Sequence, residues 1–336
     1  MVKKAAAAGY GQLALLPRSS SWRDRPELLQ GMNKNNQKVL IHLWGGFSLQ
    51  GEGKNLSRHR ELLQNGAIGL AEDDSIPPIA LLKQSFLLGD MASSPVLLAP
   101  RDKTLQGEGM VRESVETLRG GWIPDPLETE VFPLSQLLEL RKQYPNIEMR
   151  LMNISTSAGV DILTNSMNGP LASVCWWYLL EDNSSLSPYD IGWSVTPSLG
   201  SPHDRESLKE GLRNGTLTAI AVHSIPLDDA EIKQPPIQRK KGLSAYQLVL
   251  PLLWQELIVK SDWRIEKLWD VLSFGPSKML KLPEEKLIVG SNRWIIFDPN
   301  ERWVQTAQQN IQPFIANQPY EGEEIRGKVI DSGLIK

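Results

Sequence analysis

Short apolar runs alternate with amphipathic stretches along most of this 336-residue chain. Seven of the runs are rich in Val, Ile, Leu and Ala, and most follow a Pro, Gly or polar turn. Such runs are typical of strands that are buried on both faces of a parallel sheet. The predicted strands cover residues 12–16, 39–43, 67–70, 96–99, 148–152, 171–176 and 218–222.

Between these runs, apolar residues recur at three- and four-residue spacing, which predicts helices. Ser75 is a candidate N-cap for one of them, with prolines following in the first turn. Strand–helix alternation without hairpin turns favours a parallel sheet with right-handed crossovers. The predicted helices cover residues 55–63, 76–88, 134–143, 201–212, 244–258 and 262–272, and a further helix begins at residue 1.

The predicted fold is therefore an α/β barrel of the (β/α)₈ type. A closed barrel of this type needs eight strands, so the seven predicted here suggest that the first strand is missing. After Leu282 the pattern changes to short strands among Asp, Pro, Asn and Gly turns. We expect a barrel over residues 1–282 and a small β-sandwich portion over 283–336. Its predicted strands lie at 287–289, 294–297, 303–304 and 328–330.

The amino-acid composition of the chain argues against several classes of function. Lys and Arg number 36 against 39 Asp and Glu, so no basic surplus is present to neutralise nucleic acid. Cys175 is the single cysteine, which rules out an intramolecular disulfide and a cysteine-based zinc site. The four histidines are few for a histidine-rich metal centre. They are His42, His59, His203 and His223.

No segment of the sequence predicts a membrane span. The longest uncharged, apolar-leaning run covers residues 169–180 and is well short of the roughly 20 residues that a spanning helix needs. The start of the chain loosely resembles a signal peptide, but Gly9 to Gln12 interrupts its apolar run and no small-x-small cleavage site follows. We therefore expect a cytoplasmic protein without nucleic-acid or membrane partners.

Four segments resemble, in order, the signature segments of dihydroorotases, which belong to the amidohydrolase superfamily. They are residues 66–74, 153–156, 197–205 and 214–221. Residues 294–300 and 319–329 resemble the C-terminal sandwich strands of that superfamily, and the divergent cyanobacterial-type dihydroorotases are the most similar. The resemblance implies a metal-dependent TIM barrel that interconverts dihydroorotate and carbamoyl aspartate in pyrimidine biosynthesis. Zinc ions at the carboxyl ends of its strands would activate water.

Carried over position by position, the resemblance leaves few metal ligands in this chain. The family's first strand brings a His-x-His pair, and this chain starts just after the place of that strand. Ala99 and Asn153 stand at two further histidine positions, and His223 stands where the family has a proton-shuttling Asp. Glu72 or Asp73 corresponds to the bridging carboxylate. Ala offers no donor atom and Asn is a poor zinc ligand, so loss of metal-activated water is expected.

The resemblance also indicates substrate positions. Arg18 corresponds to the family's substrate-holding Asn, and Gly200 to the Arg that ends a substrate-side turn. Asn153 is a third candidate substrate contact. Arg18, Arg101 and Arg205 together are a candidate pocket for a carboxylated ligand.

Each of these features also has an ordinary structural interpretation. His223 would be a general base or a pocket-lining histidine in a decayed site, and His42 is expected in the core or at the rim. The acidic cluster 72–74 would hold a divalent cation or form a solvated loop. The basic run 238–241 is typical of a solvated loop, although it could grip a phosphate or carboxylate. The aromatic residues 176–178 are expected to fill the space of a substrate rather than to form a binding platform.

Three hypotheses follow. The first is a catalytically degenerate dihydroorotase homologue without a cofactor, kept for binding or structure. For this the resemblance implies aspartate transcarbamoylase or an active dihydroorotase as partner, and a homodimer would also cover the barrel seam. The second is a cyclic-amide hydrolase with a rebuilt site, in which Glu72 or Asp73 and His223, with His42 as a further candidate, hold one zinc ion. The third is an incomplete product whose true start lies upstream.

Overall fold

The computed structural model describes residues 2–18, 21–30, 39–91, 93–184, 186, 193–235, 238–283, 288–291, 293–306 and 315–333. Within them, seven strands form one parallel sheet in the order β1-β2-β3-β4-β7-β8-β9, and each predicted strand is confirmed. The curled sheet is of the TIM-barrel type. The strands are β1 (Gln12–Leu15), β2 (Leu40–Gly46), β3 (Ala67–Ala71), β4 (Val96–Leu98), β7 (Met149–Leu151), β8 (Leu171–Cys175) and β9 (Ala219–Ala221).

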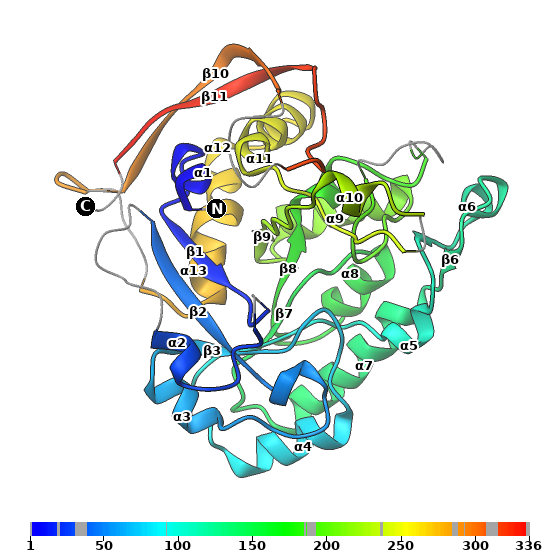
Figure 1. The fold of residues 1–336 in the computed structure, drawn as a ribbon, viewed down its shortest axis with the longest axis vertical. Helices are drawn as coiled ribbons and strands as arrows, with labels where there is room; N and C mark the ends of the chain where they lie inside the picture. The colour runs from blue at the N-terminus through cyan, green and yellow to red at the C-terminus, as the bar shows by residue number, and fades with distance from the viewer. Residues whose placement is uncertain are drawn as a thin grey trace.

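Helices cover the outer side of this sheet (Figure 1). The α-helices are α1 (Val2–Ala7), α2 (Glu27–Gln30), α3 (His59–Gln64), α4 (Ile79–Leu88), α5 (Lys103–Gln106), α6 (Val115–Arg119), α7 (Glu128–Gln143), α8 (Ser157–Thr164), α9 (Pro202–Asn214), α10 (Asp229–Ile232), α11 (Tyr246–Leu253), α12 (Ile265–Trp269) and α13 (Gly275–Met279). Two 3₁₀ turns, η2 (Leu49–Gly51) and η3 (Trp176–Leu179), and two π-helical turns, η4 (Trp254–Lys260) and η5 (Asp270–Phe274), complete the helical elements. None of the described helices is long and apolar enough to cross a membrane.

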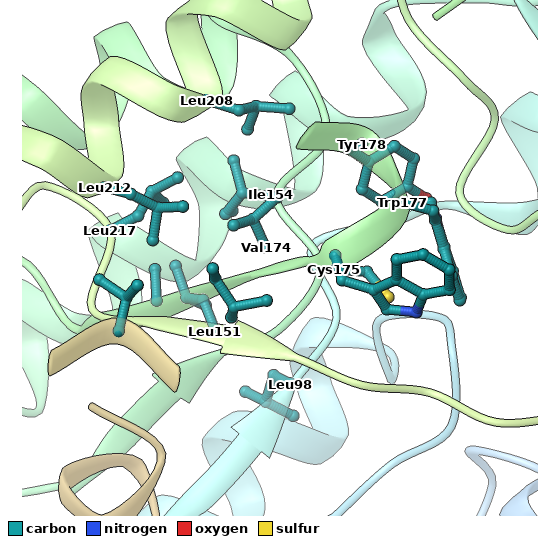
Figure 2. Packing of buried hydrophobic residues seen from close by; sticks show 14 of the residues in the cluster. Leu98, Leu151, Ile154, Val174, Cys175, Trp177, Tyr178, Leu208, Leu212 and Leu217 are labelled. Carbon is teal, nitrogen blue, oxygen red and sulfur yellow. The ribbon is translucent and has the colours of Figure 1, made fainter. Parts of the chain in front are cut away.

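The main hydrophobic core lies between the sheet and these helices. Leu151 and Val174 from two strands pack with Leu208 and Leu212 of α9 (Figure 2). Strand residues alternate between the two faces of the sheet, so a second set of side chains points into the barrel. That interior cluster includes Trp44, Leu97 and Ala219 from three different strands. Both faces of the sheet are therefore apolar, as the unbroken apolar runs predict.

The sheet has two edges, β1 and β9, and no described strand connects them. Helix α13 packs against β9 at a point where only glycine fits. A Cβ atom on Gly275 would lie 2.0 Å from the carbonyl oxygen of Thr218.

The end of this helix and the two residues after it lie across the amino-terminal side of the strands. Met279 and Leu280 join the interior cluster. Lys281 donates a hydrogen bond to the carbonyl oxygen of Ser93, just before β4, and its Nζ lies 3.4 Å from a carboxylate oxygen of Glu148, just before β7. Helix α13 therefore covers the end of the barrel opposite to the one where barrel enzymes keep their chemistry.

An antiparallel ribbon follows the barrel. Strands β10 (Trp294–Val304) and β11 (Glu324–Gly333) pair with register shifts after Ile296 and Asp298, so two of the predicted short strands form one long strand. Figure 1 shows the ribbon beside α1 and α11. Phe297 packs on Trp254 of η4, with ring centroids 5.2 Å apart. The division of the chain at residue 282 stays a prediction.

Several local predictions were wrong. Ser75 is not an N-cap, because α4 begins at Ile79 and the Ser75 hydroxyl donates to the carbonyl oxygen of Arg101 instead. Of the strand predicted at 287–289, residue 287 lies outside the described residues. Residues 288–289 instead belong to a turn, which is closed by hydrogen bonds between Ile288 and Ser291. The short parallel pair β5 (Val111–Arg112) and β6 (Pro124–Asp125) was not predicted.

Candidate functional site

The candidate site lies at the carboxyl ends of the barrel strands. Glu72, Asp73 and Asp74 follow β3, and Arg101 comes three residues after β4. Asn153 and His223 each stand two residues after their strands, β7 and β9. Because the strands are parallel, these segments meet on one face of the barrel.

Asn153 and His223 contact each other directly. The Oδ1 atom of Asn153 lies 2.8 Å from Nε2 of His223. Since an amide oxygen only accepts, Nε2 of His223 carries the proton and donates it, which leaves Nδ1 as the acceptor of the neutral ring. Burial lowers the pKa of His223, and the nearby negative charge of Asp74 opposes this shift. The ring is therefore held in its neutral form near pH 7.

The backbone of Asn153 is in the left-handed region, with φ of 60°. The segment after it is fixed by Glu130 of α7, which is almost fully buried. Its carboxylate accepts hydrogen bonds from the backbone N–H and hydroxyl groups of both Ser155 and Thr156. Burial raises the pKa of Glu130, whereas the charge of Arg112 and these hydrogen bonds oppose the rise. Glu130 is a positioning residue that sequence reasoning missed, since its partners lie about 25 residues away.

Glu72 and Asp73 point to different partners. Glu72 is buried and accepts hydrogen bonds from the backbone N–H (3.1 Å) and the hydroxyl (3.0 Å) of Ser48. Burial raises the pKa of Glu72 to about 7. Asp73 instead accepts a hydrogen bond from Nε of Arg18 (2.9 Å) and lies 3.9 Å from Nζ of Lys103. The two predicted metal ligands thus each have protein donors of their own.

Asp74 pairs with Arg101, whose side chain is almost fully buried. Nη1 of Arg101 lies 2.9 Å from Oδ2 of Asp74, and Nη2 donates to the side-chain oxygen of Gln106. The Nε atom of Arg101 has no hydrogen-bond partner among the described residues. Lys241 lies near this pair and donates to the carbonyl oxygen of Gly109 at 2.8 Å. Burial and the charge of Arg101 lower the pKa of Lys241.

The three aromatic residues after β8 fill the same end of the barrel. Trp176, Trp177 and Tyr178 are each at most 2% exposed. The hydroxyl of Tyr178 donates to the carbonyl oxygen of Pro197 at 2.6 Å, and the Trp177 ring centroid lies 6.1 Å from that of His223. Figure 2 shows Trp177 and Tyr178 near Cys175 at the end of β8. Their burial fits side chains that fill space, and their place in the space of a substrate stays a prediction.

The remaining predicted residues have other contacts. Gly200 packs against the start of α9, where a Cβ atom would lie 2.6 Å from Oδ2 of Asp204. Arg205 pairs with Asp182 at 3.0 Å, whereas Arg18 pairs with Asp73 and Arg101 with Asp74, so each of the three arginines has its own carboxylate partner. His42 lies within β2, with Nε2 2.6 Å from the side-chain oxygen of Gln12 of β1.

A zinc site of the hydrolytic kind needs three protein ligands around one point. The described residues contain no group of three or more His, Cys, Asp or Glu side chains placed to hold a metal ion. The carboxylates after β3 diverge to Ser48, Arg18 and Arg101, and the positive charge of Arg101 lies beside Asp74. The donor set of these residues therefore does not fit zinc.

The chain was compared with known proteins. No protein-family model matches it. It is 32% identical to a probable dihydroorotase-like protein of Synechocystis sp., over 98% of this chain and 81% of that protein. It is also 27% identical to a dihydroorotase of Thermus aquaticus, over 89% of this chain and 73% of the relative.

Two solved structures share the fold. An L-hydantoinase of Arthrobacter aurescens superposes with a TM-score of 0.82 at 18% identity, covering 99% of this chain and 78% of its own. A dihydroorotase of Saccharomyces cerevisiae in complex with 5-fluoroorotic acid superposes with a TM-score of 0.75 at 13% identity, covering 99% and 93%. At these identities the superpositions speak for the fold alone.

Proposed function

This chain belongs to the dihydroorotase family of the amidohydrolase superfamily, and we propose that it is a member without dihydroorotase activity, kept in pyrimidine biosynthesis for binding or assembly. One observation carries the proposal. At the strand ends where metal ligands are expected, the chain has Ala99, which offers no donor atom. The neighbouring polar residues bind each other, in an Asn153–His223 hydrogen bond and an Asp74–Arg101 ion pair.

The chemistry of the family explains why this matters. Family members are metal-dependent amidohydrolases, typically with zinc. A bound zinc ion lowers the pKa of water from about 15.7 to about 7, and without it hydroxide is scarce at neutral pH. His223 is neutral but has only Nδ1 to accept a proton, and buried aromatic side chains fill the region beside it. These features favour a protein that binds rather than hydrolyses, and that needs no cofactor.

The proposed partners are aspartate transcarbamoylase, an active dihydroorotase of the same cell, or a second copy of this chain. The family relationship and the two sheet edges, β1 and β9, which no described strand joins, support this part of the proposal. The proposed location, the cytoplasm, follows from the biosynthetic role.

The first test combines metal content with activity. The protein is produced with zinc, dialysed, and analysed for bound metal and for interconversion of dihydroorotate and carbamoyl aspartate in both directions. We expect less than about a tenth of an equivalent of zinc and no turnover above buffer. About one or two tightly held equivalents, with turnover that His223→Asn abolishes, would instead support the rebuilt hydrolase.

The second test concerns assembly. Purified protein is mixed with purified aspartate transcarbamoylase, and separately with the active dihydroorotase, and sedimentation velocity is measured. A new, faster species is expected with one of them. If the protein sediments as a monomer alone and in every mixture, the assembly role is wrong.

A further inference from the structure

We propose that residues 107–128, which we call the arm, dock on a different protein whose surface has an apolar pocket rimmed by Lys and Arg side chains. The arm runs from the end of α5 to the start of α7 and contains β5, α6 and β6. Figure 1 shows α6 and β6 projecting from the side of the barrel, at the right of the view. The inference rests on the proposed function, because it names the surface through which the proposed assembly forms.

The base of the arm is firmly held. The guanidinium of Arg112 lies 3.3 Å from a carboxylate oxygen of Asp125, and both side chains are almost fully buried. Arg112 also donates to Oγ1 of Thr129 at 2.7 Å, and its backbone N–H donates to the carbonyl oxygen of Leu199 at 3.1 Å. The arm is thus a preformed projection, so little conformational entropy would be lost when it docks.

Two large apolar side chains of α6 are turned to solvent. Val115 is 58% exposed and Leu118 is 68% exposed. Because they are three residues apart, they lie on one face of the helix. Thr117, between them, is buried, and its hydroxyl donates to the carbonyl oxygen of Arg112 at 2.6 Å. The fold therefore holds the apolar pair outward, where a partner that covers it would remove apolar surface from water.

The exposed charges of the arm are mostly negative. Four exposed glutamates stand against one exposed arginine, Arg119. The charge of Lys241 acts on Glu108, but the other three glutamates and Arg119 form no ion pair with a described residue. Exposed glutamates elsewhere, such as Glu61 and Glu139, pair with an Arg or Lys three residues away. The four glutamates of the arm are Glu108, Glu113, Glu116 and Glu128.

This charge selects the class of partner. A negative surface is repelled by nucleic acid and by anionic lipid, and it is attracted by Lys and Arg side chains of a protein. In a two-fold dimer the same patch of both copies meets, so a contact between two arms would bring like charges together. The occupant that fits the apolar pair and the carboxylates is therefore a different protein with a basic rim around an apolar pocket.

The test measures the affinity of the whole protein for purified aspartate transcarbamoylase and for purified active dihydroorotase. Isothermal titration calorimetry is performed at about 50 and about 200 mM salt. We expect binding to one of the two proteins, weakened at least about threefold at the higher salt because screening reduces the attraction. Leu118→Ser should weaken this binding about tenfold or more, as is typical of an apolar contact that a partner fully covers. Glu116→Gln should weaken it about threefold and reduce its salt dependence.

The chain offers matched controls. Leu87 is 73% exposed on α4, outside the arm, so Leu87→Ser is the control for the apolar contact. Glu61→Gln, at an exposed position of α3, is the control for the charge. Both should leave the affinity unchanged within about twofold. Because Leu118 and Glu116 are exposed, their variants are expected to fold, which melting temperatures close to that of the wild type would verify.

The outcomes separate this inference from the proposed function. If the wild type binds one of the two proteins and Leu118→Ser binds it as tightly, the docking role of the arm is wrong and the proposed assembly stands. Binding that does not weaken with salt has the same meaning. Self-association of the wild type, with no binding to either protein, would overturn the inference and leave an assembly role. If the wild type neither binds nor self-associates, both proposals are wrong.

Discussion

The carboxylate of Glu130, on α7, and the residue Ser155, after β7, are joined by two hydrogen bonds. One glutamate oxygen accepts from both the backbone N–H (2.9 Å) and the hydroxyl (2.5 Å) of Ser155. The other oxygen serves Thr156 in the same way. A single buried side chain thus satisfies four donors of the segment that carries Asn153, and it ties the candidate site to the helix layer.

Glu130→Gln is expected to destabilise the protein by about 2–4 kcal/mol, because an amide nitrogen would face donors that now meet a carboxylate oxygen. Urea unfolding measures the loss. Glu128→Gln on the exposed side of the same helix is the control, with an effect within about 0.5 kcal/mol. Equal stabilities of the two variants would refute the positioning role.

Glu72 should give the protein a distinctive pH dependence. Its pKa in the folded protein is raised to about 7 by burial, above the value of about 4.5 for an exposed glutamate. Its contribution to stability is therefore fully present below about pH 4.5 and is lost as the pH rises through about 7. Relative to Glu72→Gln, the wild type should lose about 2–3 kcal/mol over this interval. If the stabilities of the two proteins change in parallel between these pH values, the assignment to Glu72 is wrong. Glu52→Gln, at an exposed position, is the control.

His59 should act in the opposite direction. Its Nε2 donates to the carbonyl oxygen of Phe47 at 2.7 Å, and burial lowers its pKa. The contribution of this neutral ring to stability is present above about pH 6.5 and is lost as the pH falls below that value. Thermal melts between pH 5 and 8 should show a larger loss on the acid side in the wild type than in His59→Gln. His203→Gln, at an exposed position of α9, should melt like the wild type, and a similar loss in His59→Gln would show that another group is responsible.

Gly275→Ala tests the contact between α13 and β9. The new methyl group would lie 2.0 Å from the Thr218 carbonyl oxygen, so the helix must move away from the sheet. We expect a loss of about 1–3 kcal/mol, measured by chemical unfolding. Ser273→Ala adds no atom and sits at an exposed position of η5, so it should have little effect. A stable Gly275→Ala variant would mean that α13 can be displaced at little cost.

The sequence predicted the parallel strands well, because a buried strand leaves an unbroken apolar run of Val, Ile, Leu and Ala. It did not predict β5 and β6, which have two residues each and include Arg112 and Pro124. Such short pairs depend on contacts between distant residues and leave no periodic pattern.

Only part of the candidate site could be predicted from the sequence. Asp73, Asn153, His223 and Arg101 follow strands, so their place on one face could be inferred from the sequence. The solvated-loop prediction for residues 238–241 fails at Lys241, which reaches across 132 residues to Gly109. No local pattern encodes a contact of that separation. Which charge pairs with which carboxylate is likewise decided by the fold.

Helix α13 and the residue after it cover the amino-terminal end of the barrel, and these residues are translated after all the barrel strands. Met279 and Leu280 complete a cluster whose other members come from strands beginning with β1. Until residues 275–281 have left the exit tunnel of the ribosome, the interior side chains at the amino-terminal end of those strands remain exposed to water. The barrel of a nascent chain can therefore mature only after residues 275–281 have emerged, and until then its sheet depends on the outer helices for protection from aggregation.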